Sequence, residues 1–134
     1  MVFNVSVDCE GLTTLSDINI PSNTELLNCA NNNISQLNNL PQSLKVLICQ
    51  DNKIVYLDNL PQSLKLLDCS LNKITKLNNI HQPLENLNCS RNLISKLDNL
   101  PKSLILLTCH NNFLEITYKL FNPTLKNIPK YNIF

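Results

Sequence analysis

Cysteine is the residue type whose spacing in this chain could support chemistry. The 134 residues include six cysteines that recur every twenty residues, at Cys9, Cys29, Cys49, Cys69, Cys89 and Cys109. Three disulfides would suit the even number, and neighbours one strand spacing apart, about 4.8 Å, would lie within bonding range. A structural zinc ion needs four ligands around one point, which a line of single thiols does not supply. Because free cysteine behaves as a small buried hydrophobe, we expect six reduced and buried thiols.

Other candidates for catalysis or metal binding are sparse. His110 follows Cys109 and His81 stands at a predicted turn, and neither has the clustered spacing of a metal site. The sequence has no Ser–His–acid set at a suitable spacing, no glycine-rich phosphate loop and no paired carboxylates. We therefore predict that the chain is not an enzyme and uses no metal or cofactor.

The cysteines belong to a longer repeat, which must position them. Residues 40–59 read LPQSLKVLICQDNKIVYLDN, and the pattern returns at 60–79, 80–99 and 100–119. An asparagine follows the cysteine by three residues, at Asn32, Asn52, Asn72, Asn92 and Asn112. A fixed period of this length indicates one small unit stacked on copies of itself.

The shared core, L-x-x-L-x-C-x-x-N-x-[IL], resembles the leucine-rich repeat with cysteine in the third leucine position. This resemblance implies a right-handed single-layer solenoid, a horseshoe or superhelix, with a concave parallel sheet of about six strands, one per cysteine. On the convex side, prolines favour extended or polyproline-like backbone and little α-helix. The L-P-x-x-L segments are similar to those of 20-residue repeats in bacterial effectors. The composition also resembles leucine-rich-repeat proteins of giant amoeba-infecting DNA viruses.

Each turn is expected to have an apolar interior and a structural asparagine. In the copy that begins at Leu44, the side chains predicted to point inward are Leu44, Leu47, Cys49, Ile54, Leu57 and Leu60. The resemblance implies that the asparagine amide bonds to backbone groups where the chain leaves the strand, since buried polar groups are normally paired. With one glycine in the chain, asparagine must also supply any left-handed turn residue.

We interpret residues 1–134 as a single leucine-rich-repeat domain with a cap at each end. Residues 1–23 form the N-terminal capping turn, residues 24–114 the repeats, and residues 115–134 a degenerate last turn and C-terminal cap. Aromatic residues gather near that end and are expected to cover the open core: Phe113, Tyr118, Phe121, Tyr131 and Phe134.

Charge and hydropathy exclude several functional classes. The net charge of +1 implies no general attraction to nucleic acid or to an anionic membrane. Residues 1–44 hold four acids and no base, which we interpret as part of a solvated surface. No apolar run approaches the roughly 20 residues of a membrane helix, and the start MVFNVSVD does not resemble a signal peptide. We expect a cytoplasmic protein, in the host cytoplasm if it is viral or an effector.

The outward side chains of the predicted strands are the remaining candidates for function. Leu26, Val46, Leu66 and Leu106 form a predicted apolar column, with Ile48 beside it. Such patches often mark binding sites, although scattered surface apolar residues are also normal without a partner. We predict a protein–protein interaction module, with a host protein as the expected partner, that binds through Val46, Ile48, Leu66, Asp68, Asn88 and Arg91. The alternative is a structural repeat protein that self-associates; a monomer is favoured.

Overall fold

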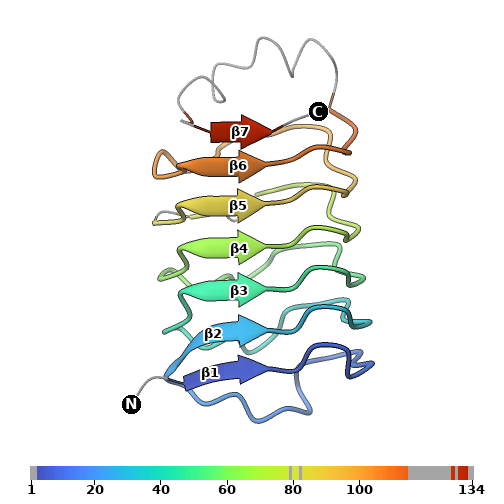
Figure 1. Cartoon of the computed structure of the whole chain (residues 1–134), viewed down its shortest axis with the longest axis vertical. Helices are drawn as coiled ribbons and strands as arrows, with labels where there is room; N and C mark the ends of the chain where they lie inside the picture. The colour runs from blue at the N-terminus through green and yellow to red at the C-terminus, as the bar shows by residue number, and fades with distance from the viewer. Residues whose placement is uncertain (1–2, 79, 82, 115–127, 129, 133–134) are drawn as a thin grey trace.

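The computed structural model is a solenoid in which one parallel β-sheet runs from the first turn to the last (Figure 1). It describes residues 3–78, 80, 81, 83–114, 128 and 130–132, the last three without their side chains. Seven strands follow one another in the sheet in chain order: β1 (Phe3–Ser6), β2 (Thr24–Asn28), β3 (Val46–Ile48), β4 (Leu66–Asp68), β5 (Asn86–Asn88), β6 (Leu106–Thr108) and β7 (Lys130–Asn132).

The strands are aligned so that equivalent positions of successive repeats pair with one another. The repeats from residue 24 to residue 114 have one length, and therefore each position forms a straight column across the sheet. The ladder also continues past the strand ends, since the N–H of Cys49 donates to the carbonyl of Asp68 at 2.8 Å. One column of paired residues is Leu26, Val46, Leu66, Asn86 and Leu106.

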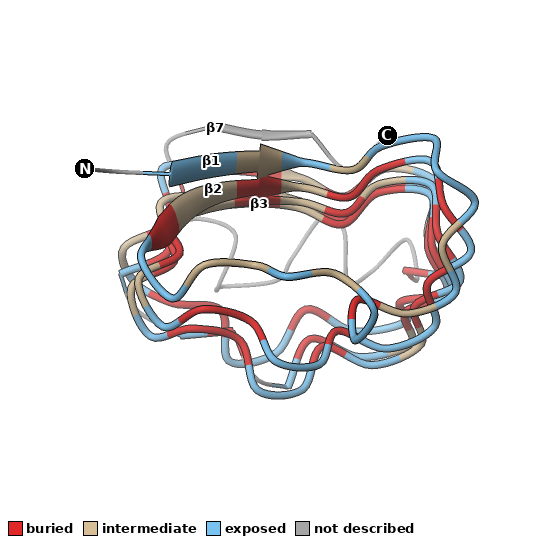
Figure 2. Ribbon diagram, turned by 90° about the horizontal axis from the view of Figure 1, so that it is seen from below, coloured by how far each residue is buried: buried red, intermediate tan, exposed pale blue. Residues whose placement is uncertain are grey.

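The interior of each turn is apolar, as the repeat predicts. Figure 2, which looks along the stack, shows that buried positions recur all around the superimposed turns. Burial of each large apolar side chain contributes roughly 1.5–3 kcal/mol. The prediction for the repeat that begins at Leu44 is confirmed, because all six expected side chains are buried: Leu44, Leu47, Cys49, Ile54, Leu57 and Leu60.

The side of the turn opposite the sheet has extended backbone rather than helix (Figure 2). Close to the start of β4, the Ser63 hydroxyl donates to the carbonyls of Gln42 and Leu44, at 2.7 and 2.8 Å, and thereby joins neighbouring turns. No α-helix occurs in the described parts of the chain, so the expectation of little helix is confirmed. Over the same residues, no helix is long and apolar enough to cross a membrane.

The asparagine column has the predicted structural role. The Asn52 Oδ1 accepts from the N–H of Ile34 at 2.9 Å, while its Nδ2 donates to the carbonyls of Cys29 and Cys49 at 2.9 and 3.1 Å. Asn72 and Asn92 repeat these contacts one and two turns later. Each amide therefore satisfies buried backbone groups in two successive turns.

The left-handed positions are only partly filled by asparagine. Asn31, Asn39, Asn59, Asn99 and Asn111 have positive φ, as predicted, but so do Cys9, Asp51, Leu71 and Arg91. The prediction that asparagine supplies these positions is therefore incomplete. At Leu71 the backbone is held by its neighbours, since its N–H donates to Ser90 and its carbonyl accepts from Asn52. Such contacts impose the conformation on whichever residue stands there.

The N-terminal turn departs from the repeat, and the prediction of six buried thiols is wrong for Cys9. All six cysteines are free, but Cys9 is exposed and the other five are buried. Leu12 stands where the asparagine would follow Cys9, so the first turn lacks its own side-chain amide to organise the bend. Asn32 of the next turn bonds to the N-terminal turn instead. Its Oδ1 accepts from the N–H of Leu12 at 2.9 Å, and its Nδ2 donates to the carbonyl of Val7 at 2.8 Å.

The C-terminal end adds a strand that the cysteine pattern did not predict. The sheet has seven strands rather than about six, because β7, which is not followed by a cysteine as the other strands are, pairs in parallel with β6. Phe113, expected to cover the open core, is instead 68% exposed. The other aromatic residues of the predicted cover lie outside the described side chains: Tyr118, Phe121, Tyr131 and Phe134.

Candidate functional site

The solvent-facing side of strands β2 to β6 forms a continuous surface, which we call the outer sheet face. In each three-residue strand the middle leucine is buried and the two flanking residues are half-buried or exposed. This alternation follows from the two-residue period of a strand. The outer sheet face is therefore made of side chains that the core does not require.

The structure brings the predicted apolar residues together. Val46 of β3 pairs with Leu66 of β4, and Leu26 of β2 lies on the other side of Val46. Ile48 shares the face with Val46 two positions along β3, and all four side chains are half-buried. The predicted column is interrupted after Leu66, because the next position is Asn86 rather than an apolar residue.

The predicted polar residues Asp68 and Asn88 lie side by side and bond to each other. The Nδ2 of Asn88 donates to Oδ2 of Asp68 at 3.0 Å. The hydroxyl of Ser70 donates to Oδ1 of Asp68 at 2.6 Å, and that of Ser90 donates to Oδ1 of Asn88 at 2.8 Å. Sequence reasoning missed the two serines, which stand two residues after their partners and hold these side chains in place.

Arg91 lies beyond the strands, at the edge of the outer sheet face. It follows β5 in a turn, with a φ of 55°, and its N–H donates to the carbonyl of His110 at 2.9 Å. The equivalent positions of the two preceding turns are Asp51 and Leu71, which also have positive φ. Arg91 is not among the residues that bond to the side chains of Asp68 and Asn88.

A shallow depression of about 170 Å³ opens on the outer sheet face where the apolar column is interrupted. Three of the predicted site residues, Leu66, Asp68 and Asn88, line it. Asn86, Leu106 and Thr108 also line it and were not predicted as site residues. The signal available in the sequence was the asparagine at residue 86, where the other repeats have leucine or valine.

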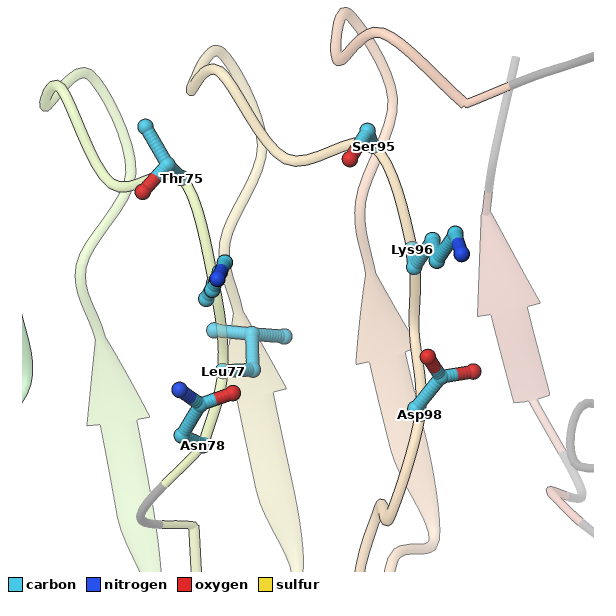
Figure 3. Close-up of a pocket in the computed structure, with 7 residues that line it drawn as sticks. Thr75, Leu77, Asn78, Ser95, Lys96 and Asp98 are labelled. Atoms are coloured by element: carbon cyan, nitrogen blue, oxygen red, sulfur yellow. The ribbon is translucent and has the colours of Figure 1, made fainter.

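A second, larger concavity of about 330 Å³ lies on the side of the turns away from the sheet (Figure 3). It is lined by Thr75, Lys76, Leu77, Asn78, Ser95, Lys96 and Asp98. Figure 3 shows the side chains of Lys96 and Asp98 extending away from the segment that carries Thr75 and Asn78. The polar groups therefore do not converge on one point, which a catalytic or ligand site requires.

The stacked cysteines are held in their neutral form. Burial raises the pKa of the Cys29 thiol from 9.0 to about 12. Burial also raises the pKa of Cys49, Cys69 and Cys89, and nearby thiols and Asp68 add to the effect. Since the thiolate is the reactive and metal-binding form, these thiols are poor nucleophiles. Across the described residues, no group of three or more His, Cys, Asp or Glu side chains is placed to hold a metal ion.

Known proteins resemble this chain in structure. No family model matches the chain, and no curated protein matches its sequence. The leucine-rich-repeat domain of a Shigella effector is 33% identical, with a TM-score of 0.82, over 97% of this chain and 57% of that one. YopM from Yersinia enterocolitica WA-314 is 37% identical, with a TM-score of 0.67, over 71% of this chain and 21% of that one.

A third similar structure also has a row of cysteines, the most distinctive feature of the core of this chain. The functional domain of InlJ from Listeria monocytogenes, described as including a cysteine ladder, is 31% identical with a TM-score of 0.65. The match covers 84% of this chain and 25% of that one. All three matched chains are thus considerably longer than this one. The parallel sheet, the repeated asparagine contacts and these similarities together show that the chain is a leucine-rich-repeat solenoid.

Proposed function

We propose that the chain is a non-catalytic module that binds another protein through its outer sheet face. The observation that carries this proposal is the contiguous apolar group formed by Leu26, Val46, Ile48 and Leu66, beside the bonded pair Asp68 and Asn88. Apolar side chains that the core does not use gain roughly 1.5–3 kcal/mol each when fully buried. The adjacent polar pair is held rigidly and would orient the partner.

The similar structures support a binding function of this kind. Two of them are an effector domain from Shigella and YopM from Yersinia enterocolitica, and each matched chain is longer than this one. By analogy, the proposed context is an effector or viral protein of the short 20-residue repeat class that acts on a host protein in the host cytoplasm. The analogy with leucine-rich-repeat proteins of giant viruses belongs to the same proposal.

The test is a double substitution on the outer sheet face, Ile48→Glu with Leu66→Glu. The tagged protein is used to capture partners from a host-cell lysate, and the captured proteins are identified by mass spectrometry. Both side chains are half-buried on the sheet surface, so the variant should remain folded but lose its partner. Circular dichroism and the melting temperature establish that the fold is retained.

The matched control is Leu93→Glu with Phe113→Glu, which makes the same change of charge away from the outer sheet face. Both residues are exposed, at 42% and 68%, and this variant should retain every partner. A folded Ile48→Glu, Leu66→Glu protein that still captures every partner would rule out this face. Light scattering over a range of concentrations tests the alternative of self-association, which a concentration-independent monomer would contradict.

A further inference from the structure

The interruption of the apolar column at Asn86 creates a site with its own chemistry. Leu66 and Leu106 flank Asn86 in the neighbouring strands, and the depression opens between them where a polar amide replaces the apolar side chain of the column. Its volume of about 170 Å³ is below the roughly 300–1,000 Å³ of pockets that enclose drug-sized ligands. The depression therefore suits one large apolar side chain rather than a small molecule.

The Asn86 side chain supplies unused hydrogen-bonding groups at this point. The amides of Asn72 and Asn88 both bond to other protein groups. By contrast, the Asn86 side chain has no hydrogen-bond partner among the residues that the structure describes. It is half-buried, and a ligand that covered it would have to replace its bonds to water. A peptide backbone offers both the carbonyl and the N–H that a side-chain amide needs.

Asp68 gives the same depression a negative charge. It is the charged residue among those that line the depression. Its oxygens accept from Ser70 and Asn88, which are neutral, and it belongs to neither the Lys45–Glu25 nor the Lys65–Glu85 ion pair. The nearby Lys65 is paired with Glu85, at 3.2 Å between Nζ and Oε1. A positively charged side chain of the partner would therefore give Asp68 the ion pair that these residues do not supply.

We propose that the depression binds an extended peptide segment of the partner that carries a large apolar side chain next to a lysine or arginine. The apolar side chain lies between Leu66 and Leu106, the peptide backbone bonds to the Asn86 amide, and the cation pairs with Asp68. This inference rests on the proposed function, because it assigns the specificity of the outer sheet face to the depression.

The probe is a phage-displayed library of random 12-residue peptides, selected on the immobilised full chain. Enriched sequences should contain Leu, Met or Phe adjacent to Lys or Arg. One enriched peptide, labelled with fluorescein, is then measured by fluorescence anisotropy against the wild-type chain and its variants. Changing the basic residue of that peptide to glutamate should weaken binding by at least about tenfold, a loss typical of an interfacial charge pair.

Two variants of the chain test the two parts of the site. Asn86→Leu removes the amide that would bond to the peptide backbone and introduces the residue found at the equivalent positions 66 and 106, and it should weaken binding by at least about tenfold. Asp68→Asn introduces the residue found at position 88, and should remove the preference for a basic residue. Asn33→Leu is the matched control away from the depression, since position 93 of the repeat is leucine, and it should bind like the wild type.

The outcomes separate this inference from the proposed function. Ile48 lies on the outer sheet face but does not line the depression. If Ile48→Glu abolishes binding while Asn86→Leu binds like the wild type, the face binds peptides and the depression does not. If neither substitution changes binding, the outer sheet face itself is the wrong surface. A selection that yields no sequences, or sequences without the apolar–basic pair, also overturns the inference.

Discussion

The Nδ2 of Asn72 lies 3.0 Å from the carbonyl oxygen of Cys49, to which it donates across two successive turns. The same amide donates to Cys69 of its own turn at 3.1 Å, and its Oδ1 accepts from the N–H of Ile54 at 2.9 Å. One side chain thus satisfies backbone groups that the bend after the strand removes from the sheet ladder. Neighbouring turns are therefore joined by polar contacts as well as by the apolar core, so their stabilities are coupled.

The first prediction concerns this amide. Asn72→Ala should lower the free energy of unfolding by about 2–4 kcal/mol, because it leaves a buried N–H and several carbonyls without partners. Denaturant-induced unfolding followed by circular dichroism measures the loss. The exposed Asn38, whose amide makes one 3.4 Å contact with Gln36, is the control, and Asn38→Ala should change the stability by less than about 0.5 kcal/mol.

A third variant separates the loss of the amide hydrogen bonds from the energetic cost of a left-handed backbone conformation. Asn59 stands at a turn with a φ of 56°, where alanine is disfavoured by about 1–2 kcal/mol. Asn59→Ala should therefore have an intermediate effect. Equal stabilities for Asn72→Ala and Asn59→Ala would refute the structural role assigned to the asparagine column.

The second prediction concerns the thiols. Ellman's reagent should react with one thiol of the native protein, Cys9, because the other five are buried. After denaturation without reductant it should detect all six. Cys9→Ser should leave the native protein without a rapidly reacting thiol. A total below six in the denatured protein would mean that disulfides form, contrary to the free cysteines of the structure.

The third prediction is a loss of stability at alkaline pH. The pKa of Cys29 is raised from 9.0 to about 12 by burial, and those of Cys49, Cys69 and Cys89 are raised by burial first and neighbouring charges second. Below pH 9 these thiols are protonated in both states and do not affect the equilibrium. Above pH 9 the unfolded chain loses protons that the folded chain retains, so the free energy of unfolding falls as the pH rises.

Each of these four thiols should contribute up to about 1.4 kcal/mol per pH unit to the fall in the free energy of unfolding, with the contribution of Cys29 ending near pH 12. Denaturant unfolding at several pH values between 8 and 11 measures the slope. Cys69→Ala removes one titrating thiol and should lower the slope by one such contribution. An unchanged slope in that variant would show that other groups cause the alkaline loss.

The fourth prediction concerns backbone strain at Leu71. This residue has a φ of 56°, in a position where asparagine stands in the first and last equivalent turns, at residues 31 and 111. Leu71→Asn should raise the free energy of unfolding by about 0.5–1 kcal/mol, since asparagine tolerates the left-handed conformation better than leucine. The melting temperature and denaturant midpoint measure the gain.

Leu93 provides a control that isolates the backbone effect. Leu71 and Leu93 are both 42% exposed, but Leu93 is not among the residues with positive φ. Leu93→Asn removes a similar apolar surface without relieving strain and should give no gain. If both substitutions stabilise the protein equally, the improvement comes from removing exposed apolar surface rather than from the backbone.

The stacking of the turns and the identity of the core could be predicted from the sequence alone. The uniform spacing of the cysteines and asparagines aligns each repeat with the next, so that Leu47, Cys49 and Ile54 must point inward together. The asparagine column also followed from the pattern, because a bend into the interior needs a side chain that both donates and accepts. These features depend on contacts within one repeat or between equivalent positions of neighbouring repeats. A repeat of constant length already specifies which residues make those contacts.

The two ends of the stack and the side-chain contacts of the outer sheet face could not be predicted from the repeat, because they arise only when particular turns pack together. Cys9 is exposed in the first turn, which lacks the repeat asparagine, and a seventh strand that no cysteine follows extends the sheet at the other end. The mutual bond of Asp68 and Asn88 and the depression beside Asn86 depend on side chains from different turns. A repeat pattern describes the average turn, whereas the ends of the stack and the outer sheet face depend on which particular side chains become neighbours once the turns are packed.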